Sequence, residues 1–171
     1  NTTSNSFMER VVVAWEKEIE NFSSFNIPVA KIRIGLVLSF SGGVLKALKI
    51  PTSLGLGTYF GNGNQGQPWI HINDLVEIFF KAYKDNWDGI YNAVAPNPVS
   101  QEKLTKTLAI NLKRPFFLPP FPKFLLKRLI GEMSHLVLDS HWVSSQKVLD
   151  KGFNFKYENI ESAIKDLVKK N

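Results

Sequence analysis

Residues 29–38 narrow the range of folds open to this chain more than any other feature. Apolar residues alternate with charged residues or glycine as far as Gly35, and the three residues that follow are wholly apolar. This pattern is typical of a strand that enters a sheet covered on both faces. The only other strand pattern of this strength covers residues 90–94. Because a sheet has about five or six strands on average, we expect these two to complete a sheet whose earlier strands lie outside this chain, which starts at Asn1 without an initiator Met.

Helical patterns surround the two strands. Capping residues and apolar spacing predict seven helical segments and one strand-like stretch at 116–118. The helices are expected over 6–21 (Ser6 with Glu9), over 44–49, from Asn73, which is expected to cap its helix, over 100–112 (capped by Ser100), over 121–130, onward through Leu138, and over 160–168. Strands that alternate with helices predict an α/β fold. A run of prolines after the fourth helix divides the chain into two parts, residues 1–112 and a mostly helical part over residues 113–171.

The composition excludes several kinds of site. The chain has no Cys and three His, so disulfides and thiolate sites are ruled out and a histidine-rich metal site is not expected. No apolar run approaches the roughly 20 residues that cross a bilayer, so we expect no membrane span. We expect a cytoplasmic protein.

Positive charge is concentrated in one stretch. The net charge is +6, and residues 102–128 hold seven basic residues against one acid. Interleaved with phenylalanines, such a stretch could dock on an acidic surface. The alternative is a solvated face, which is the commoner fate of lysines on helices. We expect no nucleic-acid partner.

Several segments, taken in order, resemble one family. They are KIRIGLVLS (31–39), GGVL (42–45), GNGNQ (61–65), WIHINDL (69–75) and GIYNAVAP (89–96). The chain resembles the C-terminal half of the extended short-chain dehydrogenase/reductases, in particular their NAD-dependent epimerase-like subfamily, also labelled nucleoside-diphosphate-sugar epimerases or cell-division-inhibitor-like proteins. RP (114–115), GEM (131–133) and GFNF (152–155) are similar to the small C-terminal domain of that subfamily.

This resemblance implies NAD or NADP, held on an N-terminal Rossmann sheet whose glycine-rich turn opens a helix. No such turn is found here, because GNG (61–63) follows no apolar strand and opens no helix. We therefore expect the N-terminal Rossmann half to be absent from this chain and its own cofactor binding to be impaired.

The family's chemistry uses a Tyr with a Lys four residues later, because the cation lowers the pKa of the phenol. The corresponding positions here are Phe7 and Val11 or, one register on, Met8 and Val12. Neither register carries the pair. The sequence therefore assigns no catalytic residue and no metal ligand, and it predicts that this chain alone is inactive.

The resemblance does imply binding residues. Ile34, Gly35 and Leu36 correspond to backbone that lines the nicotinamide pocket, where Gly35 would let the ring approach. The alternative for Gly35 is a bulge or a tight backbone contact.

Substrate contacts are expected from four residues: Gln65, Trp69, His71 and Arg114. The alternative for Trp69 and His71 is a buried structural pair on a short strand. Asp74, in the first turn of its helix, is expected to be structural. Relatives that bind nucleotide sugars carry an Arg where this chain has Gln67, and a neutral amide cannot form the charged pair with a diphosphate.

Two functions remain open from the sequence. The first is the substrate-binding part of an NAD(P)-dependent epimerase or reductase-like protein that acts on an unknown small molecule. The second is a non-catalytic NAD(P)-sensing or protein-interaction module on the same fold. The resemblance is compatible with a homo-oligomer in either case.

Overall fold

The computed structural model describes residues 7–122, 124, 128 and 140–169. The elements, in chain order, are α1 (Phe7–Glu20), the 3-10 helix η1 (Asn21–Phe25), β1 (Ala30–Ile34), β2 (Leu36–Leu38), α2 (Gly43–Ser53), β3 (Gly66–Gln67), β4 (Trp69–His71), α3 (Ile72–Lys84), β5 (Gly89–Ala93), β6 (Val99–Ser100), α4 (Gln101–Asn111), α7 (Gln146–Asp150) and α8 (Ile160–Lys169). The predicted α/β class is confirmed.

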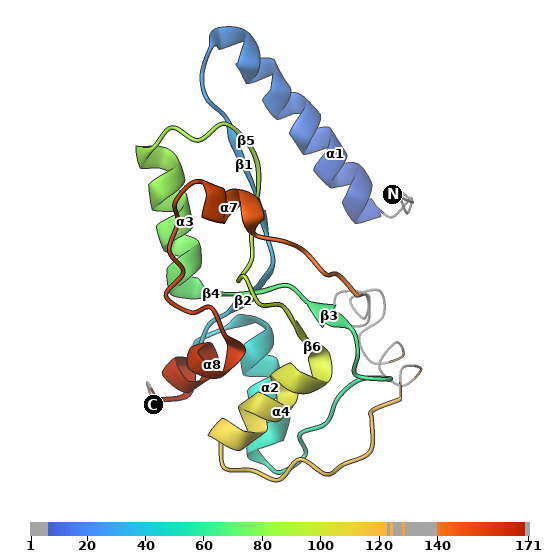
Figure 1. The fold of residues 1–171 in the computed structure, drawn as a ribbon. Coiled ribbons are helices and arrows are strands. Elements are labelled where there is room, and N and C mark those ends of the chain that lie inside the picture. Colours follow the sequence, from blue (N-terminus) through green and yellow to red (C-terminus); the bar gives the residue numbers. More distant parts are fainter. Residues whose placement is uncertain (1–6, 123, 125–127, 129–139, 170–171) are drawn as a thin grey trace.

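Three short sheets organise these elements. β1 pairs with β5 and β2 pairs with β4, both in parallel, while β3 and β6 form an antiparallel ribbon. In Figure 1, α3 and α7 lie beside the β1–β5 pair, and α2, α4 and α8 gather at the opposite end of the molecule. The strand predicted over 29–38 is therefore two strands, because its partner changes from β5 to β4 at Gly35.

Two hydrophobic clusters form the core. One packs α2, α4 and α8 around Leu38 and Trp69, and the other packs α3, β5 and α7 around Ile70. Trp69 and Ile70 are consecutive residues of β4 and are both fully buried. Because successive strand residues point to opposite faces, this one strand supplies both clusters.

Most predicted helices are confirmed, with different boundaries. The helix predicted over 44–49 extends to Ser53 through Pro51, and its last turn is held by a bond from Thr52 Oγ1 to the Leu48 carbonyl. The stretch predicted as a strand at 116–118 is irregular, and one isolated bridge joins Phe60 to Phe121 instead. Two further helices are predicted, one over 121–130 and one onward through Leu138. Most of their residues lie outside the described residues.

Helix α1 stands apart from the other helices in Figure 1. The sequence favours core-facing positions for Phe7, Val11 and Val12 of this helix, and this expectation is wrong for Val12, which is 44% exposed. Trp15 on the same helix is 67% exposed. The helix is tied to β1 through Glu16, whose carboxylate accepts from Arg33 Nη2 at 2.8 Å. Among the described residues, no helix is both long and apolar enough to cross a membrane.

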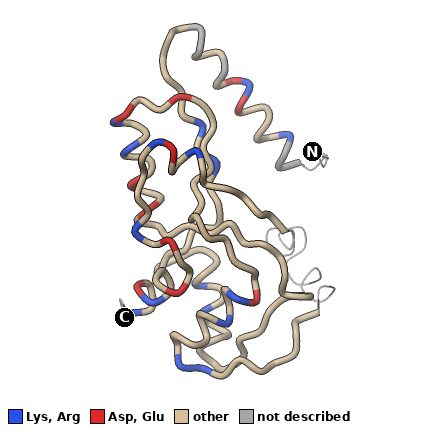
Figure 2. Tube along the Cα trace, viewed as in Figure 1, with Lys and Arg blue, Asp and Glu red and all other residues tan. Residues whose placement is uncertain are grey.

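Acidic and basic positions are interspersed along the described chain (Figure 2). Within the basic stretch 102–128, Lys103 Nζ lies 3.1 Å from the Glu161 carboxylate, so one of these cations already has an acidic partner. Residues 123 and 125–127 of this stretch lie outside the described residues. Docking on an acidic surface stays a prediction.

Candidate cofactor and substrate site

The site begins at Gly35, where one strand changes its partner. Gly35 N donates to the Ala93 carbonyl at 3.2 Å, and Leu36 N donates to the Pro68 carbonyl at 2.7 Å. A side chain at Gly35 would overlap the Pro68 carbonyl oxygen and would lie 2.7 Å from Val94 Cγ1. Gly35 therefore makes the tight backbone contact that the sequence analysis gave as the alternative to a close approach of the nicotinamide ring.

Ile34 occupies the exposed side of this junction. It is the last residue of β1, opposite Ala93 of β5, and it is 50% exposed. Ligands of open α/β sheets bind beyond the carboxyl ends of parallel strands. Ile34 thus stands at the carboxyl end of the β1–β5 pair, and a cofactor contact from it stays a prediction.

Two buried glutamines flank Gly66, one just before the ribbon strand β3 and one in it. Gln65 and Gln67 are each 4% exposed. Gln65 Nε2 donates to the Phe60 carbonyl at 3.0 Å, and Gln101 Oε1 accepts from Phe60 N at 3.1 Å, so two glutamines hold one residue of the preceding loop. Among the described residues, Gln65 Oε1 and Gln67 Nε2 have no hydrogen-bond partner. A buried acceptor and a buried donor without partners are uncommon in folded proteins.

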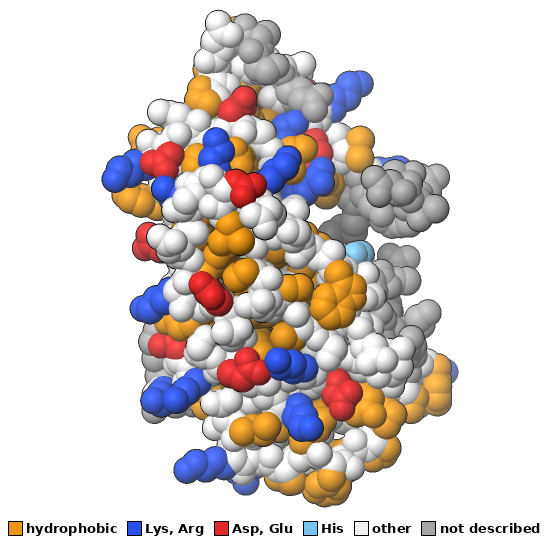
Figure 3. Space-filling model, in the orientation of Figure 1, with side chains coloured by type: hydrophobic (Ala, Val, Ile, Leu, Met, Phe, Trp, Pro, Cys, Tyr) orange, Lys and Arg blue, Asp and Glu red, His pale blue; other side chains and the backbone are white. Residues whose placement is uncertain are grey.

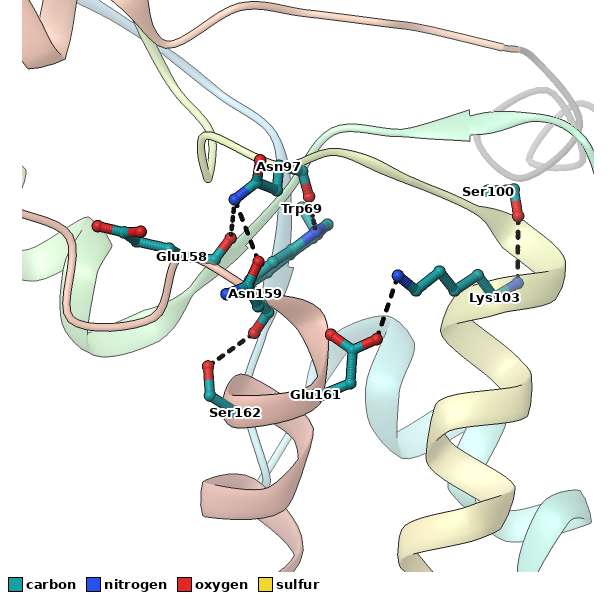
Figure 4. Close-up of polar contacts among 8 residues, drawn as sticks. All are labelled: Trp69, Asn97, Ser100, Lys103, Glu158, Asn159, Glu161 and Ser162. Carbon is teal, nitrogen blue, oxygen red and sulfur yellow. Dashed lines mark hydrogen bonds and ion pairs between the residues drawn. The ribbon is translucent and has the colours of Figure 1, made fainter.

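Trp69 and His71, predicted to contact substrate, are completely buried. The Trp69 indole N–H donates to the Asn97 carbonyl at 3.0 Å, and Asn97 Nδ2 donates to the Glu158 carbonyl and to Asn159 Oδ1 (Figure 4). This chain of bonds joins β4 to the start of α8. In the described structure, Trp69 thus has the surroundings of a structural residue.

We expect Trp69→Phe to lower the free energy of unfolding by about 2 kcal/mol, because the Asn97 carbonyl loses a buried donor and the smaller ring leaves a gap. Urea unfolding measures this change. Trp15→Phe is the matched control, since that indole is largely exposed, and its effect should be below about 0.5 kcal/mol. Equal losses in the two variants would contradict the role assigned to Trp69.

His71 caps α3, a role predicted for Asn73. Its Nδ1 accepts from Asn73 N at 3.1 Å, so the prediction of Asn73 as the cap is wrong. The ring stacks on Tyr157 at 3.8 Å between centroids, and Nε2 lies 3.5 Å from the Asp166 carboxylate. Its two ring nitrogens and one face are thus all directed at the protein.

Asp74 connects the same helix to the C-terminal part. It is 2% exposed, and its two carboxylate oxygens accept from Lys156 N at 3.1 Å and Tyr157 N at 3.0 Å. The expected structural role is confirmed. Its hydrogen-bond partners are backbone N–H groups some eighty residues away. The carboxylate therefore does more than complement the dipole of its own helix.

Arg114 lies away from the glutamines. It follows α4 and is exposed, whereas Gln65 contacts the first residue of α4 through a bond from Gln101 N to the Gln65 carbonyl. A helix of this length spans about 16 Å, so the structure does not bring Arg114 and Gln65 together. A substrate contact from Arg114 stays a prediction.

A segment that the sequence analysis did not single out crosses β3. Gly66 N donates to Ser140 Oγ at 2.9 Å, and His141 N donates to the Gly66 carbonyl at 3.1 Å. The Trp142 ring covers Gly66 so closely that a Cβ there would lie 2.7 Å from Nε1, yet this tryptophan is 61% exposed. A glycine between two glutamines in a strand is a signal for such a close approach.

The described residues contain no group of three or more His, Cys, Asp or Glu that could hold a metal ion. The candidate site is therefore a set of aliphatic, amide and aromatic groups around the Gly35 junction and the antiparallel ribbon that precedes β4: Ile34, Leu36, Gln65, Gln67 and Trp142. Such groups bind and orient an organic molecule.

This fold and these strand ends define a class, the Rossmann-type α/β proteins. Solved epimerase structures superpose on the chain. The human epimerase family protein SDR39U1 with NADPH matches with a TM-score of 0.79 and 29% identity, over 83% of this chain and 48% of that one. A nucleoside-diphosphate sugar epimerase from Corynebacterium glutamicum matches with a TM-score of 0.73 and 29% identity, over 98% of this chain and 32% of that one.

Sequence comparison points to particular relatives. An epimerase family protein of Staphylococcus epidermidis is 37% identical over 164 residues, which is 95% of this chain and 54% of the relative. The chain spans about half the length of such relatives. Residues 121–167 match a domain of unknown function, DUF1731. The predicted resemblance to epimerase-like proteins is thus confirmed in both sequence and fold.

Proposed function

We propose that this chain forms the substrate-binding part of an NAD(P)-dependent epimerase or reductase-like protein that acts on a small molecule. The observation that carries the proposal is the junction at Gly35, where parallel strands meet a ribbon with a buried acceptor and a buried donor that have no partner among the described residues. The solved relative that contains NADPH supports a nicotinamide cofactor.

The described residues fit one end of such a cofactor. Ile34, half exposed at the junction, offers aliphatic surface to a nicotinamide ring. Leu36 follows two residues later and packs against the cluster of α2, α4 and α8, and the Gln65 and Gln67 amides are buried in the adjoining ribbon. No glycine-rich turn opens a helix among the described residues: Gly61 and Gly63 lie in a turn bonded to Phe121 and Glu102. The pyrophosphate would therefore be held outside the described part of the chain.

A nicotinamide cofactor, when bound, accepts or donates a hydride. The role of this chain would be to pack against the ring, orient the substrate and exclude water with Trp142. The proposal assigns no proton-transfer residue to it, because neither pair of positions in α1 holds Tyr and Lys.

A non-catalytic NAD(P)-sensing module is the second candidate, and the same missing pair favours it. NAD(P)H fluorescence titration, followed by a hydride-transfer assay over a metabolite panel, separates the two candidates when both this chain and the natural gene product are measured. Cofactor binding with hydride transfer supports the enzyme, and tight binding without transfer supports the sensor. Absence of cofactor binding from the gene product overturns both.

We expect Ile34→Asp to weaken NAD(P)H binding to the gene product about tenfold or more, because a carboxylate replaces aliphatic surface against the ring. Ile27→Asp is the matched control. Ile27 precedes the other end of β1 and is similarly exposed, at 54% against 50%. Equal affinities of the two variants would remove Ile34 from the cofactor site.

A further inference from the structure

A cavity of about 550 Å³ lies at the end of the molecule away from β1 and β5. Its walls come from α2, the loop over residues 56–60, Thr105 of α4 and the proline-containing segment 118–122. In Figure 1 this segment follows α4 beneath the helices, and in Figure 3 hydrophobic side chains gather over the same end. The volume falls in the range of sites that take small organic molecules.

The described residues that line this cavity are apolar and uncharged. The only polar side-chain groups among them are three threonine hydroxyls, and each donates within the protein: Thr52 to the Leu48 carbonyl at 2.6 Å, Thr58 to the Pro119 carbonyl at 2.7 Å and Thr105 to the Gln101 carbonyl at 3.1 Å. A phosphate or carboxylate needs cations or free donors. No described residue that lines this cavity supplies one, so the chemistry of these walls favours an uncharged occupant.

The proline wall is fixed in place. Phe121 N donates to the Tyr59 carbonyl at 2.7 Å, and Gly61 N donates to the Phe121 carbonyl at 3.1 Å. Three prolines in this segment restrict the backbone further. A preformed apolar wall loses little conformational entropy when it binds a ligand.

The cavity is connected to the candidate site through Phe60. This residue lines the cavity, and its backbone N–H and carbonyl are both held by the glutamines at positions 101 and 65. Gln101 also donates from Nε2 to Thr105 Oγ1 in the cavity floor at 3.0 Å. One hydrogen-bonded cluster therefore supports the amide ribbon on one side and the apolar cavity on the other.

We propose that this cavity binds an uncharged aliphatic or aromatic group of the substrate. That the occupant belongs to the substrate rests on the proposed function above. That the cavity binds an apolar group rests on its walls alone. The proposal narrows the substrate class from any small molecule to one with a substantial apolar part, in contrast to a nucleotide sugar, whose bulk is polar and charged.

The test uses N-phenyl-1-naphthylamine, a neutral probe that becomes fluorescent in apolar sites, with 1-decanol and UDP-glucose as competitors. The expected result is saturable binding that decanol displaces and UDP-glucose does not. Leu56→Glu should weaken probe binding about tenfold. Leu54→Glu is the matched control, because Leu54 lies in the same loop, is exposed and does not line the cavity.

A second pair of variants guards against misfolding of the first. Leu118→Asp changes the proline wall, and Phe117→Asp changes its exposed neighbour outside the cavity. Circular dichroism should show that all four variants are folded. The proposal is supported when Leu56→Glu and Leu118→Asp weaken probe binding and the two control variants do not.

Three outcomes overturn the proposal: no saturable probe binding, equal effects within each pair of variants, or loss of probe binding when the chain self-associates, as measured by light scattering. The last outcome would assign the cavity to a second copy of the chain. Probe binding to the natural gene product without NAD(P)H binding to it would reject the proposed function and keep the apolar site. NAD(P)H binding without probe binding would do the reverse.

Discussion

Gly35→Ser is expected to lower the free energy of unfolding by about 3 kcal/mol or more, a large share of the 5–15 kcal/mol that typically holds a domain together. The added Cβ would overlap the Pro68 carbonyl oxygen, which is backbone and is itself bonded to Leu36 N. Neither strand can withdraw without loss of pairing at the junction. Urea unfolding followed by circular dichroism gives the difference directly.

Gly42→Ser is the matched control for this variant. Gly42 lies beyond the other end of β2, and a Cβ there meets nothing within 4 Å. Its backbone is extended, with φ −163°, and it caps α2, where serine is at least as good a residue as glycine. A loss of more than about 1 kcal/mol in this control, or a loss below that value in Gly35→Ser, would contradict our account of the junction.

Asp74→Asn should have the second-largest effect, a loss of about 3 kcal/mol. An amide offers one oxygen where the carboxylate offers two, so its NH2 group would face the backbone N–H of Lys156 or Tyr157. One buried donor then loses its acceptor. Urea unfolding measures the loss, and faster hydrogen exchange at these two amides would locate it.

Asp88→Asn provides the comparison for Asp74→Asn. Asp88 Oδ1 accepts a single bond from Val29 N at 3.1 Å, and this contact is exposed. An amide oxygen can replace that acceptor, so the change should cost less than about 1 kcal/mol. If both Asp→Asn changes are tolerated alike, the two-oxygen role of Asp74 is wrong.

Local patterns predicted the elements better than their connections. The apolar run at 29–38 indicated a buried strand, but the change of partner at Gly35 depends on Pro68 and Ala93, which are distant in sequence. The cap of α3 was assigned to Asn73 because asparagine is a common cap. In the structure the His71 ring supplies the acceptor, and its orientation depends on contacts with Tyr157 and Asp166.

The candidate site was predictable only where it lies on the chain's own strands. Ile34 was assigned to the site by the family resemblance, whereas the pattern at 29–38 predicted one continuous strand with no end at Ile34. Trp142 could not be predicted, because the segment that carries it returns to β3 from more than seventy residues away. The exposed face of α1 shows the same limit. The spacing of its apolar residues indicates one apolar side of the helix, but no pattern in the sequence shows that Trp15 is exposed.

The alternation of β4 between the two hydrophobic clusters has a consequence for how this chain unfolds. Trp69 and Ile70 share one backbone but belong to different clusters, so neither cluster can melt while that strand keeps its pairing with β2. The two halves of the core should then lose structure together, in a single cooperative transition. A destabilising substitution in either cluster would therefore lower the stability of both.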